Sequence, residues 1–472
     1  MKPVYYTFAT PKGHYVYDRN SNSLLSIAAH EHEALCDPSH KHYEVVLQTF
    51  QDKGYCKVGN LKKIQHPECP MLPYHMKSRI QQLILQVVQR CNLFCEYCSY
   101  SGQYNQRTHA NKDMSLETAY KSIDFLMKHS TDLEAVNISF YGGEPLLALD
   151  TIKSCVEYVK SEYSDRKVMY NTTTNGTLFT EESVSFLQAE NFSVMISLDG
   201  PAFVHDKHRK FIDGRGSFDT VMKGAEYIKE YFPKLYRSIT FNAVISPESD
   251  YKCVKDFFDA ETVLQDATLR SAPVNDVGSK VRVEYDDAYF ITGRRETLKV
   301  LLCALGFISP KSVSKLFIPD FSNIETFRKG IDAYMPLPET DHHGGPCLPG
   351  VARLFVDVNG YFYPCERVSE TSEAMRIGHI DTGFDIEKAI KILNIGELTE
   401  EECLNCWNFR FCGLCVAFVE KDGKLDKLTK LSSCTAMLND SDYKLRVLCL
   451  FKEMEVLFSE VSFDEKISDI SV

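Results

Sequence analysis

From residue 82 onward, short runs of apolar and β-branched residues alternate with longer segments that have the amphipathic spacing of helices. The predicted strands are residues 83–88, 136–140, 167–173, 193–198, 239–244 and 267–273. The predicted helices between them lie near residues 115–129, 149–163, 180–190, 217–232 and 250–259. This alternation indicates βαβ units around a parallel sheet that is covered on both faces. We therefore expect an α/β fold over residues 76–285, a partial TIM-like (β/α)6 barrel or an open sheet, with functional residues at the carboxyl ends of its strands.

The pattern before this region is different. Residues 3–17 predict a β-hairpin around the turn Pro11–Gly13, and residues 29–36 and 41–53 predict helices, the second ended by Gly54. A short strand is predicted over 55–58, and the three prolines between 65 and 74 predict a linker. Residues 1–75 are therefore interpreted as a small α+β module and linker that precede the barrel.

The last part of the chain has fewer regular patterns. Residues 286–340 are predicted to be a helical bridging region, and residues 341–440 a Cys-rich domain with few long elements. A helical tail, about 441–458, is expected within residues 441–472.

Composition and charge narrow the class of protein. The chain has 472 residues, of which 44% are hydrophobic and 25% charged, as in globular proteins, and its net charge is −12. This charge argues against a nucleic-acid partner, because phosphate binding needs clustered Lys and Arg. The longest apolar run, 300–308, is too short to span a bilayer, and residues 1–13 lack a signal-peptide pattern. We expect a cytoplasmic protein with no membrane partner.

Cysteine usage points to metal chemistry. The chain has 17 cysteines, and cytoplasmic thiols stay reduced, so clustered cysteines favour metal or cluster ligation over disulfides. The first cluster, Cys91, Cys95 and Cys98, has the spacing C-x3-C-x2-C directly after the first barrel strand. Such a loop can hold three corners of a [4Fe-4S] cube and leave one iron open. A zinc site made by these thiols and a distant His is the alternative.

This loop and the repeat that follows it resemble the radical S-adenosylmethionine (SAM) superfamily over residues 82–275. Four further motifs fall in order after later strands: Gly142-Gly143-Glu144-Pro145, Asn175-Gly176, Ser197 to Pro201 with Asp199, and His205 to Arg209. Each alone could be a turn. The resemblance implies that a SAM-binding [4Fe-4S] cluster generates a 5′-deoxyadenosyl radical. It also implies that the GGEP loop receives the SAM ammonium through Glu144, and that Arg209 lies near the SAM carboxylate. Asn175, Ser197 and Asp199 would contact the ribose and methionine.

Seven more cysteines resemble the SPASM extension of radical SAM peptide maturases, which carries two auxiliary [4Fe-4S] clusters. The family pattern would assign Cys347, Cys365 and Cys415 to cluster I, and Cys403, Cys406, Cys412 and Cys434 to cluster II. Two departures stand out: only two residues separate Cys412 and Cys415, and the upstream cysteine that completes cluster I is missing. The alternative is a zinc knuckle made by Cys403, Cys406, Cys412 and Cys415.

An open iron in cluster I suggests a thioether-forming maturase of the sactipeptide or ranthipeptide kind, acting on a Cys-containing precursor peptide. His342, His343 or Cys303 could instead complete that cluster. The resemblance implies that residues 1–75 form a winged-helix-like module that captures the leader peptide by β-augmentation, and that flavodoxin or ferredoxin supplies single electrons. The alternative for this module is a role in dimerisation or packing.

Two rival functions remain open. An anaerobic sulfatase-maturing oxidase would use an acidic base at Glu366, which could otherwise be a plain surface carboxylate. A non-enzymatic zinc or iron–sulfur scaffold would leave the GGEP and SLDGP motifs unexplained.

Overall fold

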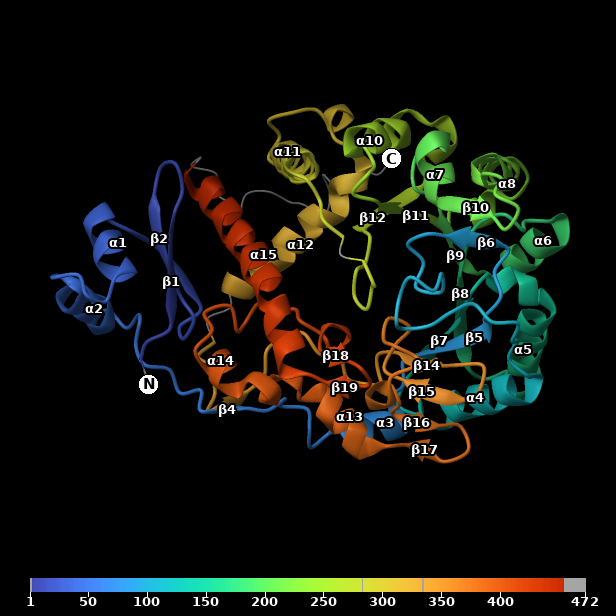
Figure 1. Cartoon of the computed structure of the whole chain (residues 1–472), viewed down its shortest axis with the longest axis horizontal. Helices are drawn as coiled ribbons and strands as arrows, with labels where there is room; N and C mark the ends of the chain where they lie inside the picture. Colours follow the sequence, from blue (N-terminus) through green and yellow to red (C-terminus); the bar gives the residue numbers. More distant parts are fainter. Residues whose placement is uncertain (1, 282, 333–334, 454–472) are drawn as a thin grey trace.

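The computed structural model describes residues 2–281, 283–332 and 335–453. Its centre is a run of six parallel strands, neighbours in the order β5-β7-β8-β9-β11-β12 (Figure 1). These are β5 (Gln82–Val88), β7 (Ala135–Gly142), β8 (Lys167–Thr174), β9 (Ser193–Ser197), β11 (Ile239–Ile245) and β12 (Thr268–Pro273). All six predicted strands are confirmed, and with them the α/β class. The sheet is open and does not close into a barrel, because its first and last strands are not paired with each other.

The helices predicted between these strands are also confirmed. They are α4 (Leu116–Lys128), α5 (Leu149–Glu162), α6 (Glu181–Ala189), α8 (Phe218–Tyr231) and α10 (Tyr251–Ala260). Apolar strand residues such as Leu85, Ile138 and Ile196 are fully buried. Burial of such residues explains why short runs rich in apolar and β-branched residues predicted the strands.

The same sheet continues into the C-terminal part of the chain. Strand β14 (Leu354–Val356) pairs in parallel with β5, and β15 (Tyr361–Tyr363), β16 (Gly378–His379) and β17 (Gly383–Phe384) follow antiparallel, which makes ten strands. Strands of two or three residues carry no readable alternation, so the sequence gives no sign of them.

Helices form the bridging region and the end of the described chain. The predicted helical region at 286–340 contains α11 (Asp287–Ala304) and α12 (Ile318–Asp332). The tail helix, predicted from 441, begins earlier: α15 spans Lys427–Glu453 and includes Cys434, and the predicted residues 454–458 lie outside the described residues. Its first turns are rich in Ser, Thr, Asn and Asp, which have modest helix propensity. No helix in the described ranges is both long and apolar enough to cross a bilayer.

The N-terminal region forms a small sheet of its own. Strands β1 (Tyr5–Ala9) and β2 (His14–Asp18) make the predicted hairpin, β3 (Ser23–Ile27) adds a third strand, and α1 (Ala29–Cys36) and α2 (Tyr43–Asp52) follow. The strand predicted over 55–58 is wrong. Cys56 has a φ of +49°, which interrupts an extended backbone.

The linker prediction is partly wrong as well. Helix α3 (Leu72–Ser78) begins inside it, with Pro73 in the first turn, where proline is tolerated. Before it, β4 (Lys63–Ile64) pairs with β13 (Thr340–Asp341) from the end of the bridging region. The N-terminal sheet also packs on the C-terminal part, since the Tyr6 ring stacks on Trp407 at 4.2 Å.

Candidate functional site

The first cysteine cluster lines a cavity at the carboxyl end of the parallel sheet. Cys91, Cys95 and Cys98 all contribute to this cavity of about 180 Å³. The other predicted residues that line it are Gly142, Gly143, Asn175, Ser197 and Arg209. Strand β6 (Leu93–Cys95) pairs with β10 (Arg209–Phe211), which holds the cysteine loop beside the arginine. Residues from the ends of β5, β7, β8 and β9 thus meet as predicted for a parallel sheet.

The two glycines are required by close backbone packing. A Cβ atom on Gly142 would lie 1.9 Å from the Val88 carbonyl oxygen, and one on Gly143 would lie 2.1 Å from the Arg90 carbonyl oxygen. The Gly143 amide donates to the Val88 carbonyl at 2.9 Å. The GGEP loop is therefore pressed against the backbone that leads into Cys91, which no side chain would permit.

Glu144 does not line this cavity. Its side chain is fully buried and accepts hydrogen bonds from the Thr174 hydroxyl at 2.7 Å, the Asn175 amide at 2.7 Å and the Leu146 amide at 3.0 Å. Burial raises the pKa of Glu144 to about 7, against the effect of these donors. The carboxylate caps the short helix that starts at Pro145 and ties the loop to the end of β8.

Asp199 is likewise turned away from the cavity and acts on Arg209. The Arg209 Nε donates to Asp199 Oδ2 at 2.8 Å, the Tyr97 hydroxyl donates to the same oxygen, and the Val244 amide donates to Oδ1 at 3.0 Å. Asp199 is 1% exposed and Arg209 7%. Although burial alone would raise it, the pKa of Asp199 is lowered by the Arg209 guanidinium. The ion pair fixes the arginine in the cavity wall.

Asn175 links the cysteine loop to β8. Its side-chain nitrogen Nδ2 donates to Asn92 Oδ1 at 2.8 Å and lies 3.7 Å from the Cys91 sulfur. Burial raises the pKa of Cys91 to about 11 and that of Cys95 to about 12, so both thiols are protonated at neutral pH without a metal. Binding of a metal centre would release these protons.

The donor set of this cavity fits an iron–sulfur cluster with a zwitterionic cofactor. Three thiols lie on one side, and an arginine, an amide and glycine backbone lie on the others. In the described ranges, no three His, Cys, Asp or Glu side chains converge as around a single metal ion.

Residues 85–260 match the sequence profile of the Radical SAM superfamily. The matched region is referred to as the radical SAM domain. The chain is 35% identical over 156 residues to an uncharacterized protein of Methanocaldococcus jannaschii, covering 33% of this chain and 51% of that protein. It is 33% identical over 161 residues to the cysteine-type anaerobic sulfatase-maturating enzyme of Clostridium novyi, covering 33% of this chain and 42% of that enzyme. The chain thus spans about half or less of these relatives.

Two longer likenesses extend beyond the radical SAM domain. The radical SAM cyclopropyl synthase TigE of Paramaledivibacter caminithermalis is 24% identical over 395 residues, with 80% of this chain and 77% of that protein covered. The solved structure of native anSMEcpe with bound AdoMet superposes with a TM-score of 0.58 and 22% identity, covering 78% of this chain and 99% of that one. The latter shows a shared fold.

The seven C-terminal cysteines gather in two sets. The pKa of Cys365 is raised to about 11 by burial, then by Glu366 and Cys415, while burial and Cys347 raise the pKa of Cys415. The other set is Cys403, Cys406, Cys412 and Cys434. Burial raises the pKa of Cys406 and Cys412 to about 11, and Cys403 and Cys434 also act to raise both values. The grouping matches the two ligand sets that the family resemblance implies.

The residues considered as a fourth ligand of the first set make other contacts in the structure. The Gly396 amide donates to His342 Nε2 at 2.8 Å, and the pKa of His343 is lowered by burial and, further, by His342 and Lys430. Both histidines therefore lie near Lys430, which also contacts the second set. Cys303 is buried in α11.

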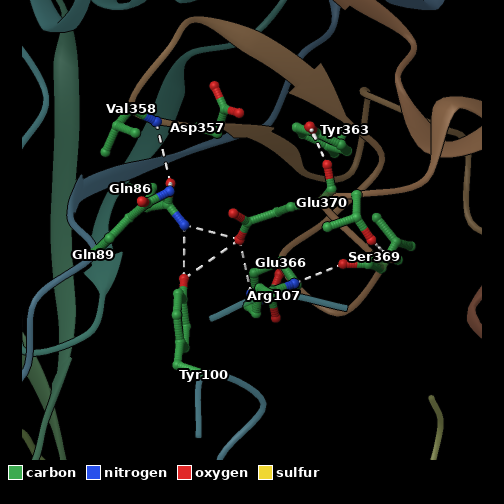
Figure 2. A network of polar contacts seen from close by, with 12 residues as sticks. Gln86, Gln89, Tyr100, Arg107, Asp357, Val358, Tyr363, Glu366, Ser369 and Glu370 are labelled. Carbon is green, nitrogen blue, oxygen red and sulfur yellow. Dashed lines mark hydrogen bonds and ion pairs between the residues drawn. The ribbon is translucent and has the colours of Figure 1, made fainter. Parts of the chain in front are cut away.

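A buried polar network joins the radical SAM domain to the C-terminal part (Figure 2). The Gln86 amide donates to Glu370 at 2.8 Å and to the Tyr100 hydroxyl at 2.7 Å, and Arg107 pairs with Glu370 at 3.1 Å. The Arg107 guanidinium also donates to the backbone carbonyl of Glu366 at 2.8 Å. Sequence reasoning missed this network, because an isolated Arg and Glu in loops give no signal of a shared partner.

Glu366 lies at the edge of this network and is not a surface carboxylate. Its side chain is 16% exposed, and Oε1 accepts from Arg353 at 2.7 Å. Oε2 is buried and has no hydrogen-bond partner among the described residues. Next to it in sequence is Cys365, and Glu366 also contributes to the raised pKa of Tyr141, a residue of the cavity wall, after burial as the main cause. It therefore lies near both Tyr141 and Cys365.

Proposed function

We propose that this protein is a radical SAM oxidoreductase that modifies a ribosomally made precursor peptide by joining a cysteine sulfur to a carbon atom. When bound, a [4Fe-4S] cluster with SAM supplies a 5′-deoxyadenosyl radical for hydrogen abstraction. Cys91, Cys95 and Cys98 are the residues that would hold this cluster.

Different groups of the chain would bind different parts of the cofactor. Arg209, oriented by Asp199 and Tyr97, keeps guanidinium N–H groups in the cavity wall for a carboxylate. Gly142 and Gly143 offer backbone to an ammonium group. Glu144 orders the loop through three protein donors, and its role as an acceptor for the ammonium stays a prediction.

The observation that carries the thioether proposal is the three-thiol set Cys347, Cys365 and Cys415. An iron–sulfur cluster held by these thiols alone keeps one coordination position for an outside ligand, and Cys347 is exposed. A substrate cysteine is a strong candidate for that position, because binding as a thiolate also fixes the sulfur near its target. The second set would hold a further auxiliary cluster.

The partners follow from the same proposal. The N-terminal sheet has β1 and β3 as its two edges, either of which can accept an extended leader peptide as an added strand. Flavodoxin or ferredoxin would deliver the electrons.

The test uses reconstituted protein, SAM, dithionite and a Cys-containing precursor peptide. We expect 5′-deoxyadenosine together with a crosslinked peptide that has lost two hydrogen atoms. A peptide with Ser in place of Cys should still give 5′-deoxyadenosine but no crosslink. Crosslinking of the Ser peptide, or no peptide product at all, would contradict thioether formation.

A second candidate, oxidation of a peptide Cys or Ser to formylglycine, is favoured by one observation. Glu366 has a buried, unpartnered carboxylate oxygen close to Cys365, as a proton acceptor for the substrate would need. One relative of this chain is named a cysteine-type anaerobic sulfatase-maturating enzyme. An aldehyde that reacts with hydrazide probes, and that disappears in Glu366→Gln, would establish this function in place of crosslinking.

A further inference from the structure

Helix α15 carries a buried lysine without an acidic partner. Lys430 is 2% exposed, and its ammonium donates to the Thr399 hydroxyl at 2.6 Å and lies 3.7 Å from the Cys403 sulfur. Across the described ranges of the chain it forms no ion pair. Because an ammonium loses its hydration when it is buried, it is stable there only beside compensating negative charge.

A carboxylate near Lys430, that of Glu402, forms its ion pair with another lysine and contributes only part of that charge. This other lysine is Lys427, at 2.7 Å. His342 Nε2 accepts a hydrogen bond from the Gly396 amide at 2.8 Å and supplies no negative charge. The remaining neighbours are thiols: Cys403, and Cys434 one helical turn along, whose Sγ lies 3.7 Å from the Lys430 carbonyl oxygen. The ammonium therefore faces the second cysteine set.

A second buried cation approaches the same set from the N-terminal sheet. Arg19, directly after β2, is 3% exposed and donates to the carbonyl oxygens of Leu404 at 2.7 Å and Cys406 at 3.3 Å. Its Nε is buried without a partner among the described residues. The adjacent Asp18 carboxylate already accepts hydrogen bonds from Asn20 and Ser21 in its own turn and from the Cys56 amide.

We propose that Lys430 and Arg19 are the counter-charges of an anionic iron–sulfur cluster held by Cys403, Cys406, Cys412 and Cys434, and that they raise its reduction potential. The inference rests on the cluster assignment made under the proposed function. A four-iron cluster with four thiolates carries about two negative charges when oxidised and one more when reduced. Buried cations and an N–H donor at a ligating sulfur stabilise the more negative state, so one-electron reduction by an outside donor becomes easier.

Arg19 gives this arrangement a further property. It belongs to the N-terminal module, so the potential of a cluster in the C-terminal region depends on a residue from the opposite end of the chain. The contacts of Arg410 with the Arg19 and Asn20 carbonyl oxygens, at 2.7 and 3.1 Å, hold that turn in place.

The primary test is a redox titration of reconstituted protein followed by electron paramagnetic resonance. Lys430→Met should shift the midpoint of one auxiliary cluster to lower potential and leave the Cys91-Cys95-Cys98 cluster unchanged. Lys430→Arg, which keeps the charge, should restore most of the shift. Lys444→Met is the matched control, since this lysine lies on the same helix about 21 Å away and is paired with Asp440.

A measurement on metal-free protein separates charge from structure. Without a cluster, Lys430→Met removes a buried charge that forms no ion pair in the described residues and should raise resistance to urea, while the loaded variant should lose iron faster to a chelator. A loaded variant with full iron and an unchanged midpoint would overturn the proposal, as would equal destabilisation of both forms. Wild-type protein with only the iron of one cluster would overturn the cluster assignment itself, independently of any peptide product.

Discussion

The two cysteine-rich regions of this chain are assembled in different ways. In the radical SAM domain, three thiols lie within one loop, 91–98, and the backbone of two glycines is packed against its entrance. In the C-terminal region the thiols come from separate segments, and buried side chains and charges surround them. The first site is defined mainly by backbone packing, and the second mainly by side-chain contacts between distant parts of the chain.

This difference determines what a substitution should do. A backbone-defined site tolerates no added atom at its contact points, whereas a side-chain-defined site is sensitive to the loss of a charge or of its partner.

The largest effect is expected from removing the first site. With Cys91, Cys95 and Cys98 changed to Ala, formation of 5′-deoxyadenosine should fall to background, because no thiolate remains to hold the SAM-binding cluster. If all three clusters form, about a third of the iron, roughly four atoms of twelve, should be lost. Iron and sulfide assays check this, and stoichiometric zinc in the wild-type protein would contradict it.

A pair of glycine substitutions compares the two regions directly. Gly143→Ala forces a Cβ to within 2.1 Å of the Arg90 carbonyl oxygen and should lower the free energy of unfolding by about 3–5 kcal/mol. Gly413→Ala, between Cys412 and Cys415, meets no heavy atom within 4 Å and should change it by less than about 0.5 kcal/mol. Urea unfolding measures both, and equal effects would remove the distinction between the regions.

The buried network between the regions should be nearly as sensitive. Glu370→Gln leaves the Arg107 guanidinium without its 3.1 Å ion-pair partner, which should lower the free energy of unfolding by about 3 kcal/mol. In the double variant with Arg107→Met, the loss should be smaller than the sum of the single losses. Strict additivity in urea unfolding would show that the two side chains do not depend on each other.

The smallest effect concerns pH. The pKa of Glu144 is raised from 4.5 to about 7 by burial, so the folded protein binds a proton that the unfolded chain has released over this interval. Its contribution to stability is therefore present at low pH and lost as the pH rises, by about 2 kcal/mol between pH 5 and pH 7. The difference between wild-type and Glu144→Gln unfolding curves should show this slope, and a flat difference would argue against a buried, titrating carboxyl.

The same contrast explains what the sequence could predict. The six strands and the order of motifs at their ends were predictable, because long apolar runs and contiguous motifs are local signals. The orientation of Glu144 was not, because the GGEP motif does not reveal that Thr174 and Asn175 donate hydrogen bonds to its carboxylate. The pairing of Lys430 with Cys403 depends on a long helix whose polar first turns hide its start.

The docking of the N-terminal sheet on the second cysteine set has an optical consequence. Trp407 is the single tryptophan of the chain, lies between Cys406 and Cys412, and is stacked on Tyr6 with ring planes 8° apart. All of the tryptophan fluorescence thus originates at the junction of these two parts. An iron–sulfur chromophore beside it would quench this emission, and release of the N-terminal sheet would expose the indole to water and shift the emission to longer wavelength. The protein therefore carries its own probe for both events.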